Sequence, residues 1–148
     1  MDINAAIDRL TWLCHHIPTL IGAASEQELE RKPSPEKWSK KEILGHLIDS
    51  AANNHQRFIR IQSEHEPVIF YNQNDWVGLS RYNDIATEQL ISTWKHYNLH
   101  LAAIAKAIPS ENLSRIGRGR DGQPHTLKWY FDDYVDHMEH HLRQIITY

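Results

Sequence analysis

Residues 126–146, TLKWYFDDYVDHMEHHLRQII, decide the fold class, because their apolar side chains recur with the period of an α-helix. One face of such a helix collects six large apolar residues, namely Leu127, Phe131, Tyr134, Met138, Leu142 and Ile145. A helix with a single apolar face buries that face against other elements. Thr126, which lies just after Pro124, is a suitable N-cap. We therefore predict a helix over residues 126–146 that packs against other helices.

Three further segments, residues 4–21, 39–63 and 84–108, have the same amphipathic period. The second begins with SKKE, in which the serine and the glutamate predict a capping box. The third ends before Pro109, which cannot continue a helix. The stretch SEQELERKPSPEKW, between the first two segments, predicts a short helical turn followed by a proline-rich entry.

The connection between the second and third helices, residues 64–83, is long for a compact domain. Its PVIFY stretch has strand-like composition but no partner, and a lone strand is not stable. Long loops in compact domains usually carry function. We therefore predict one domain, residues 1–148, with an all-α fold: a four-helix bundle with a long crossover between helices two and three.

Composition excludes several classes of protein. The chain has 41% hydrophobic and 24% charged residues, within the globular range, and no apolar run as long as a membrane span. The net charge is −3 and no basic stripe is present, so we expect no nucleic-acid partner and no membrane partner. The amphipathic N-terminus does not resemble a signal peptide, so we expect a cytoplasmic protein. A homodimer is compatible with such a bundle, although the sequence defines no interface patch.

The single cysteine, Cys14, excludes an internal disulfide and a multi-cysteine zinc site, and its place on an apolar helix face predicts a packed core thiol. Histidines, in contrast, are frequent: the chain has eleven. His137 and His141 lie four residues apart on one shoulder of the last helix, whereas His140 points towards solvent. Such a pair can offer two imidazoles to one metal, or can form an ordinary polar shoulder. The sequence alone leaves both interpretations open.

Several metal motifs are excluded. A zinc-protease helix needs Glu after its first histidine, and Met138 occupies that position. A di-iron bundle needs two Glu-x-x-His motifs, which the chain lacks. The stretch GRGRDG, residues 117–122, is a glycine-rich turn and not a dinucleotide fingerprint, because no βαβ unit precedes it.

On the second helix, His46 lies off the apolar arc and shares its side with Ser50, Asn53 and Arg57. This polar line is either a solvated face or one wall of a polar cleft between two helices. Asp49 is a weak candidate for a general base. Asp49, Asp133 and Asp136 are also candidates to orient an imidazole, although such acids are usually surface residues.

Three stretches resemble, in order, the DinB/YfiT-like superfamily: KWSKKEILGHLIDSAANNHQRFIR, YNQNDWV and TLKWYFDDYVDHMEHHLRQI. The resemblance spans residues 33–145, and the first helix is its least diagnostic part. It implies a four-helix bundle that holds a divalent metal with three histidines, one from the second helix and two from the last. These positions correspond to His46, His137 and His141 in this chain.

The resemblance also implies chemistry, because family members are described as metal-dependent hydrolases or as enzymes that use small thiols. Three imidazoles leave an open position on Zn²⁺ or Ni²⁺, where water or a low-molecular-weight thiol cosubstrate would be activated. Tyr71, Asn74 and Trp76 match a family segment expected near the mouth of the pocket. Asn74 stands where the family pattern has Asp, so no acid role is carried over to this loop.

The predicted substrate pocket therefore comprises Ser50, Asn53, Arg57, Tyr71, Asn74 and Trp76.

Three hypotheses for the function of the protein are compatible with the sequence. The protein is a metalloenzyme that acts on a small-molecule substrate as a hydrolase or a thiol transferase. Alternatively, it is a non-catalytic metal- or ligand-binding module, for example in stress response. In the third case, the histidines have only a structural role.

Overall fold

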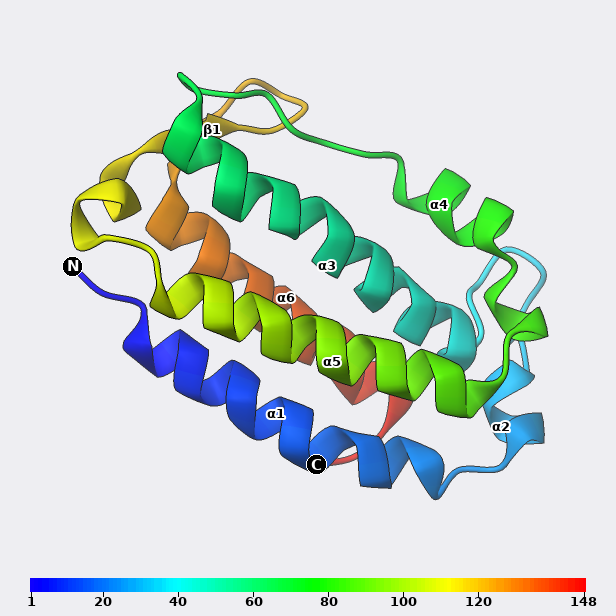
Figure 1. The fold of residues 1–148 in the computed structure, drawn as a ribbon. Helices are drawn as coiled ribbons and strands as arrows, with labels where there is room; N and C mark the ends of the chain where they lie inside the picture. Colours follow the sequence, from blue (N-terminus) through cyan, green and yellow to red (C-terminus); the bar gives the residue numbers. More distant parts are fainter.

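Four long helices make up most of the computed structural model, which describes residues 1–148 (Figure 1). They are α1 (Asn4–Gly22), α3 (Lys40–Ser63), α5 (Thr87–Lys106) and α6 (Leu127–Ile145). The shorter elements are α2 (Glu26–Glu30), α4 (Gln73–Ser80), η1 (Tyr82–Asp84), η2 (Ser110–Ser114), β1 (Ile116–Arg118) and β2 (Pro124–Thr126). The predicted all-α four-helix bundle is confirmed.

The long helices pack in the circular order α1, α5, α3, α6, so that α3 contacts both α5 and α6. Figure 1 shows that α3 and α5 run in the same direction, while α1 and α6 run opposite to both. Two consecutive long helices can run parallel only if the chain between them returns along the length of the bundle. Residues 64–86 make this return and carry α4 and η1 on the way.

Aromatic side chains fill the contact between α3 and α6. Phe58 and Phe131 are fully buried, with ring centroids 5.2 Å apart, and the Tyr134 ring lies 5.6 Å from that of Phe58. The Tyr134 hydroxyl donates a hydrogen bond to Asn98 Oδ1 at 2.5 Å, which ties α6 to α5. Cys14 is also fully buried, and burial raises the pKa of its thiol to about 12, as a packed core thiol requires. No helix combines the length and apolar character needed to cross a lipid bilayer.

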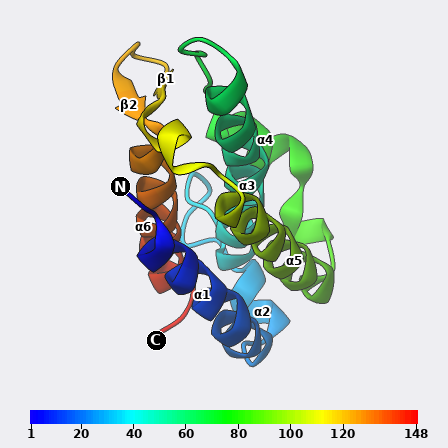
Figure 2. The same ribbon diagram turned by 60° about the vertical axis from the view of Figure 1, so that its left-hand side comes forward.

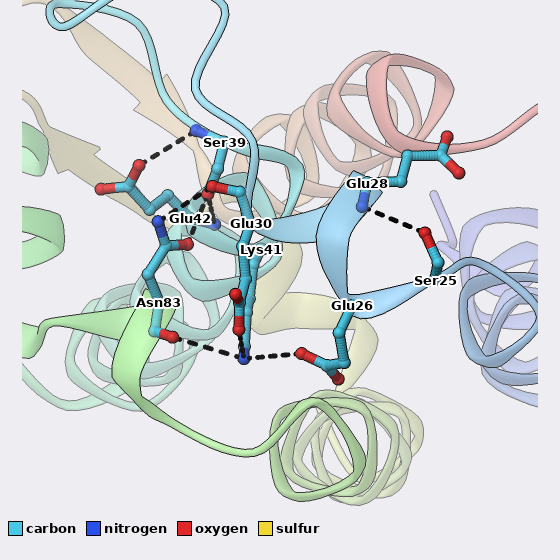
Figure 3. A network of polar contacts seen from close by, with 8 residues as sticks. All are labelled: Ser25, Glu26, Glu28, Glu30, Ser39, Lys41, Glu42 and Asn83. Carbon is cyan, nitrogen blue, oxygen red and sulfur yellow. Dashed lines mark hydrogen bonds and ion pairs between the residues drawn. The ribbon is translucent and has the colours of Figure 1, made fainter.

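A polar network fastens α2 to the start of α3 (Figure 3). The buried ammonium group of Lys41 lies 3.3 Å from a carboxylate oxygen of Glu26 and 3.3 Å from one of Glu30. It also donates a hydrogen bond to the Asn83 carbonyl at 3.5 Å, so the end of the crossover is connected to α2 and α3 as well. The predicted capping box is present at Ser39, the N-cap of α3. Because of these contacts, α2 and the segment after it close one end of the bundle, as Figure 2 also shows.

The structure differs from the sequence-based expectations in the connections. The third long helix starts at Thr87, not at residue 84, because Tyr82–Asp84 forms η1. A hairpin of β1 and β2 precedes α6, and Val68 pairs with Arg118 in a parallel bridge. The PVIFY stretch therefore has a partner, contrary to expectation. Three-residue strands are too short to produce a recognisable period in the sequence.

Gly45 allows η1 to approach α3 closely. A Cβ atom at this position would lie 2.0 Å from Cδ2 of the Tyr82 ring. The Tyr82 hydroxyl, in turn, donates a hydrogen bond to the buried carboxylate of Asp49, one turn further along α3. The absence of a side chain at residue 45 thus positions the crossover against α3, directly before His46.

We expect Gly45→Ala to lower the free energy of unfolding by about 1–3 kcal/mol, because the new methyl group would displace Tyr82. The matched control is Gly78→Ala in α4, where a Cβ meets no atom within 4 Å. Alanine there should be neutral or stabilising by up to about 1 kcal/mol, owing to its higher helix propensity. Urea denaturation of both variants provides the measurement. Equal stabilities for the two variants would contradict the close approach of Tyr82.

Candidate metal centre

Three histidines from two helices converge at the end of the bundle that α2 closes. Each of His46, His137 and His141 offers one ring nitrogen, and these three nitrogens all lie within 4.8 Å of one another. The Nε2 atoms of His137 and His141 are 3.2 Å apart, as expected for residues one helical turn apart on α6. The His46 ring comes from α3, and its centroid lies 4.8 Å from that of His141.

The histidine cluster fits a divalent metal ion. His46 is fully buried, yet neither of its ring nitrogens has a hydrogen-bond partner. An unpaired buried polar group is costly, and a metal ligand bond would remove that cost. His141 Nδ1 lies 2.9 Å from Gln144 Oε1; because the amide oxygen can only accept, this contact places the proton on Nδ1. The Nε2 lone pair of His141 is then free for a metal, with Gln144 orienting the ring from behind.

Burial keeps these imidazoles neutral, which is the form that binds metals. Desolvation lowers the pKa of His46 to about 3, and the neighbouring His141 and His137 lower it further. Burial also lowers the pKa of His137 to about 4 and shifts that of His141 in the same direction. All three rings are therefore uncharged at neutral pH.

The polar side of α3 is one wall of a cleft and not a solvated face. His46, Ser50 and Asn53 are buried, and Arg57 is half-buried. The amide of Asn53 donates to the Asp49 carbonyl of its own helix. The polar line that periodicity left ambiguous therefore faces α6 and the crossover.

A small cavity of about 190 Å³ lies beside His137. It is bounded by α3, the crossover and α6, through Ser50, Asn54, Arg57, Tyr71, Asp133, Tyr134 and His137. Three of the predicted pocket residues, Ser50, Arg57 and Tyr71, thus come together here. Asn54 and Asp133 were not predicted as pocket residues, because on a helix projection they differ little from other polar surface positions.

A larger cavity of about 490 Å³ lies on the side of His141. Its apolar wall is made by Trp38 and Ile43, and the Trp38 ring centroid is 4.9 Å from that of His46. Its rim is charged: Arg31, Lys37, Lys40 and Glu28 all line it, and Lys40 pairs with Glu28 at 2.7 Å. The histidine cluster therefore separates two cavities, with His137 lining one and His141 the other.

The remaining predicted residues lie away from these cavities. Asn74 and Trp76 are exposed on α4, although the Trp76 ring contacts that of Tyr71 with centroids 5.6 Å apart. Asn53 lines neither cavity.

Asp49 also lines neither cavity. Burial raises the pKa of its carboxyl group to about 6, and its Oδ2 atom is buried without a hydrogen-bond partner. His140 is exposed, as predicted.

The residue that contacts His141 from behind was not among the predicted site residues. Three acids, Asp49, Asp133 and Asp136, were candidates to orient an imidazole, but none of them makes a hydrogen bond to a cluster histidine. The amide of Gln144 has this position instead. The i,i+3 spacing of His141 and Gln144 on one helix was the available signal.

The chain is similar to known proteins both in sequence and in fold. The sequence profile of the DinB superfamily matches residues 9–145. A protein of Halalkalibacterium halodurans named "putative metal-dependent hydrolase" is 23% identical over 145 residues, covering 97% of this chain and 84% of its own length.

Two solved structures share the fold. YfiT from Bacillus subtilis, described as "a probable metal-dependent hydrolase with an unusual four-helix bundle topology", superposes with a TM-score of 0.87 at 19% identity, over 96% of this chain and 82% of YfiT. A histidine-to-alanine mutant of a mycothiol-dependent maleylpyruvate isomerase gives a TM-score of 0.79 at 9% identity. That match covers 98% of this chain and 61% of the isomerase.

The lowered pKa of His46 predicts a pH-dependent stability of the metal-free protein. In the unfolded chain an imidazole has a pKa of about 6.5. Between this value and about 3 the unfolded chain binds more protons than the folded one, so the free energy of unfolding falls as the pH is lowered. Between pH 7 and pH 5 we expect a loss of about 2 kcal/mol from a buried imidazole of this kind.

Urea unfolding of the metal-free wild type and of His46→Leu, at pH 7 and pH 5, measures this loss. The raised pKa of Asp49 acts in the opposite sense, but it is present in both proteins and cancels in the difference. His46→Leu should lose less stability than the wild type on acidification. The same loss in both proteins would refute the assignment of His46 as a buried neutral imidazole.

Proposed function

The chain belongs to the DinB superfamily, and we propose that it is a metal-dependent enzyme that acts on a small molecule at the site formed by His46, His137 and His141. The observation that carries this proposal is the state of His46: fully buried, without a hydrogen-bond partner on either nitrogen, and facing the other two histidines. A purely structural histidine in a core would be expected to have a partner.

The three imidazoles are the proposed ligands of Zn²⁺ or Ni²⁺. An ion held by these three neutral nitrogens would lower the pKa of a water molecule or a thiol bound beside them. The protein contributes the positions of these nitrogens. Gln144 fixes the tautomer of His141, and Trp38 shields His46 from solvent.

The two cavities favour an enzyme over a module that only binds a metal. A site that only stores an ion needs no space on either side of its ligands, whereas here His137 and His141 each line a cavity. Asp133 is the single carboxylate of the smaller cavity, and burial raises its pKa. We propose it as the proton acceptor, because a base with a raised pKa accepts protons closer to neutral pH. We give Asp49 no catalytic role, since it lines neither cavity.

Two chemistries are compatible with this site: hydrolysis, and transfer of a low-molecular-weight thiol to an electrophile. The names of the Halalkalibacterium halodurans protein and of YfiT support the first. The mycothiol dependence of the isomerase supports the use of a thiol.

The metal content of the protein should depend on His46, His137 and His141 but not on His140. We expect untagged wild-type protein to bind about one equivalent of Zn²⁺ or Ni²⁺ after dialysis, measured by elemental analysis. His137→Ala and His141→Ala should each remove most of this binding, because two imidazoles remain. His140→Ala is the matched control and should bind as the wild type does, since His140 is exposed on the same helix. A wild type that gains no metal would refute the proposal.

Turnover distinguishes the candidate chemistries. The metal-loaded protein is incubated with a thiol and a chlorinated aromatic electrophile, and separately with panels of esters and amides. Product in one assay that disappears in His141→Ala but persists in His140→Ala would establish the corresponding activity. Full metal occupancy without product in any assay would contradict the proposal that the protein is an enzyme. It would support the alternative of a non-catalytic metal-binding module.

A further inference from the structure

Arg57 carries a half-buried positive charge that forms no ion pair with a carboxylate. Its guanidinium donates to Asn54 Oδ1 at 3.2 Å and to the Ile69 carbonyl at 3.0 Å, and both acceptors are neutral. Its Nε–H is buried and has no partner. The Tyr130 ring centroid lies 5.1 Å from Cζ and gives one face of the cation a further neutral contact. Withdrawing a charge even partly from water without an ion-pair partner is unfavourable.

Arg57 lines the small cavity beside His137. Asp133 lines the same cavity and its charge acts on Arg57 across it, but the two side chains form no ion pair. The cavity thus has a half-buried cation, two hydroxyl groups from Ser50 and Tyr71, and a metal-ligand candidate on one wall. No anion, however, pairs directly with Arg57.

The chemistry and size of the cavity define which anion would fit it. A guanidinium binds carboxylates through two parallel N–H donors, a geometry that an ammonium group cannot provide. At about 190 Å³, the cavity is smaller than the ~300–1,000 Å³ of a complete ligand pocket, so it accommodates one end of a molecule. The neighbouring carboxylate of Asp133 would repel a phosphate dianion more strongly than a carboxylate monoanion.

We propose that Arg57 is a specificity-determining residue that binds a carboxylate group of the small molecule reacting at the histidine cluster. This inference rests on the proposed function, since it assigns the reacting group to the cluster and the carboxylate to the cavity beside His137. The site therefore selects small molecules that carry a carboxylate a short distance from the reacting atom, and it discriminates against their neutral counterparts.

Carboxylate binding can be tested on metal-free protein, so that its outcome does not depend on the metal. Propionate is added to ¹⁵N-labelled wild-type protein, with 1-propanol as the neutral control, and the Arg57 Nε–H signal and the backbone signals of Tyr71 and His137 are followed. We expect saturable shifts with propionate and none with 1-propanol. Equal responses to the two probes, or no response to either, would overturn the proposal.

Three variants assign the effect to Arg57. Arg57→Gln should weaken propionate binding at least about tenfold, because the charge and the paired donors are lost. Arg57→Lys keeps the charge without the paired donors and should bind with intermediate affinity. Asp133→Asn leaves Arg57 intact and should strengthen binding several-fold, because a like charge is removed from the cavity. Unchanged affinity in Arg57→Lys and Asp133→Asn would overturn the proposal even if Arg57→Gln failed to fold.

A second measurement uses zinc-loaded protein and a matched pair of thiols, 3-mercaptopropionate and 3-mercapto-1-propanol. Calorimetry should show tighter binding of the thiol acid in the wild type and loss of this preference in Arg57→Gln. Propionate binding without any metal uptake would support the carboxylate site at Arg57 and contradict the proposed metalloenzyme. Metal uptake and turnover without a preference for carboxylates would support the metalloenzyme and contradict the carboxylate site.

Discussion

The packing of α3 against α6 is the constraint on which the rest of the molecule depends. The Phe58, Phe131 and Tyr134 rings fix the distance between the two helices, and this contact places His46 opposite His137 and His141. Ring packing of this kind is close and directional, so small rotations of either helix are resisted. The position of the histidine cluster is therefore a consequence of the core packing between α3 and α6.

Contacts on the far side of α6 limit its rotation further. Glu139 lies between the two histidines in sequence but on another face, and its carboxylate accepts from Arg9 of α1 at 2.6 Å. The hydroxyl of Tyr148 donates to the same carboxylate at 3.1 Å, which also secures the C-terminal residue. One helix thus anchors its charged face to α1 while its imidazoles face α3. The polar residues of the cleft reduce stability, because Arg57 and His46 keep buried polar atoms without hydrogen-bond partners.

The sequence predicted the parts of the molecule that repeat with the helical period. The four long helices and the shared shoulder of His137 and His141 follow from spacing alone, because every side chain on a regular helix has a fixed direction. The same spacing could not decide whether His46 faces solvent or α6, since that depends on which helix packs beside α3. The DinB/YfiT-like resemblance supplied this relation between helices. The β-hairpin, the place of α4 and the role of Gln144 depend on contacts between distant segments or on single side chains, which leave no period in the sequence.

The close contact between Gly45 and Tyr82 has an evolutionary consequence. A larger residue at position 45 can be accommodated only if the ring at position 82 becomes smaller, because the two would otherwise occupy the same space. A smaller residue at position 82, however, would leave the buried carboxylate of Asp49 without its hydroxyl donor. Positions 45, 49 and 82 are therefore expected to vary together across related chains. A related chain that has the sequence Gly-His on its second long helix should also have a tyrosine near the end of the crossover.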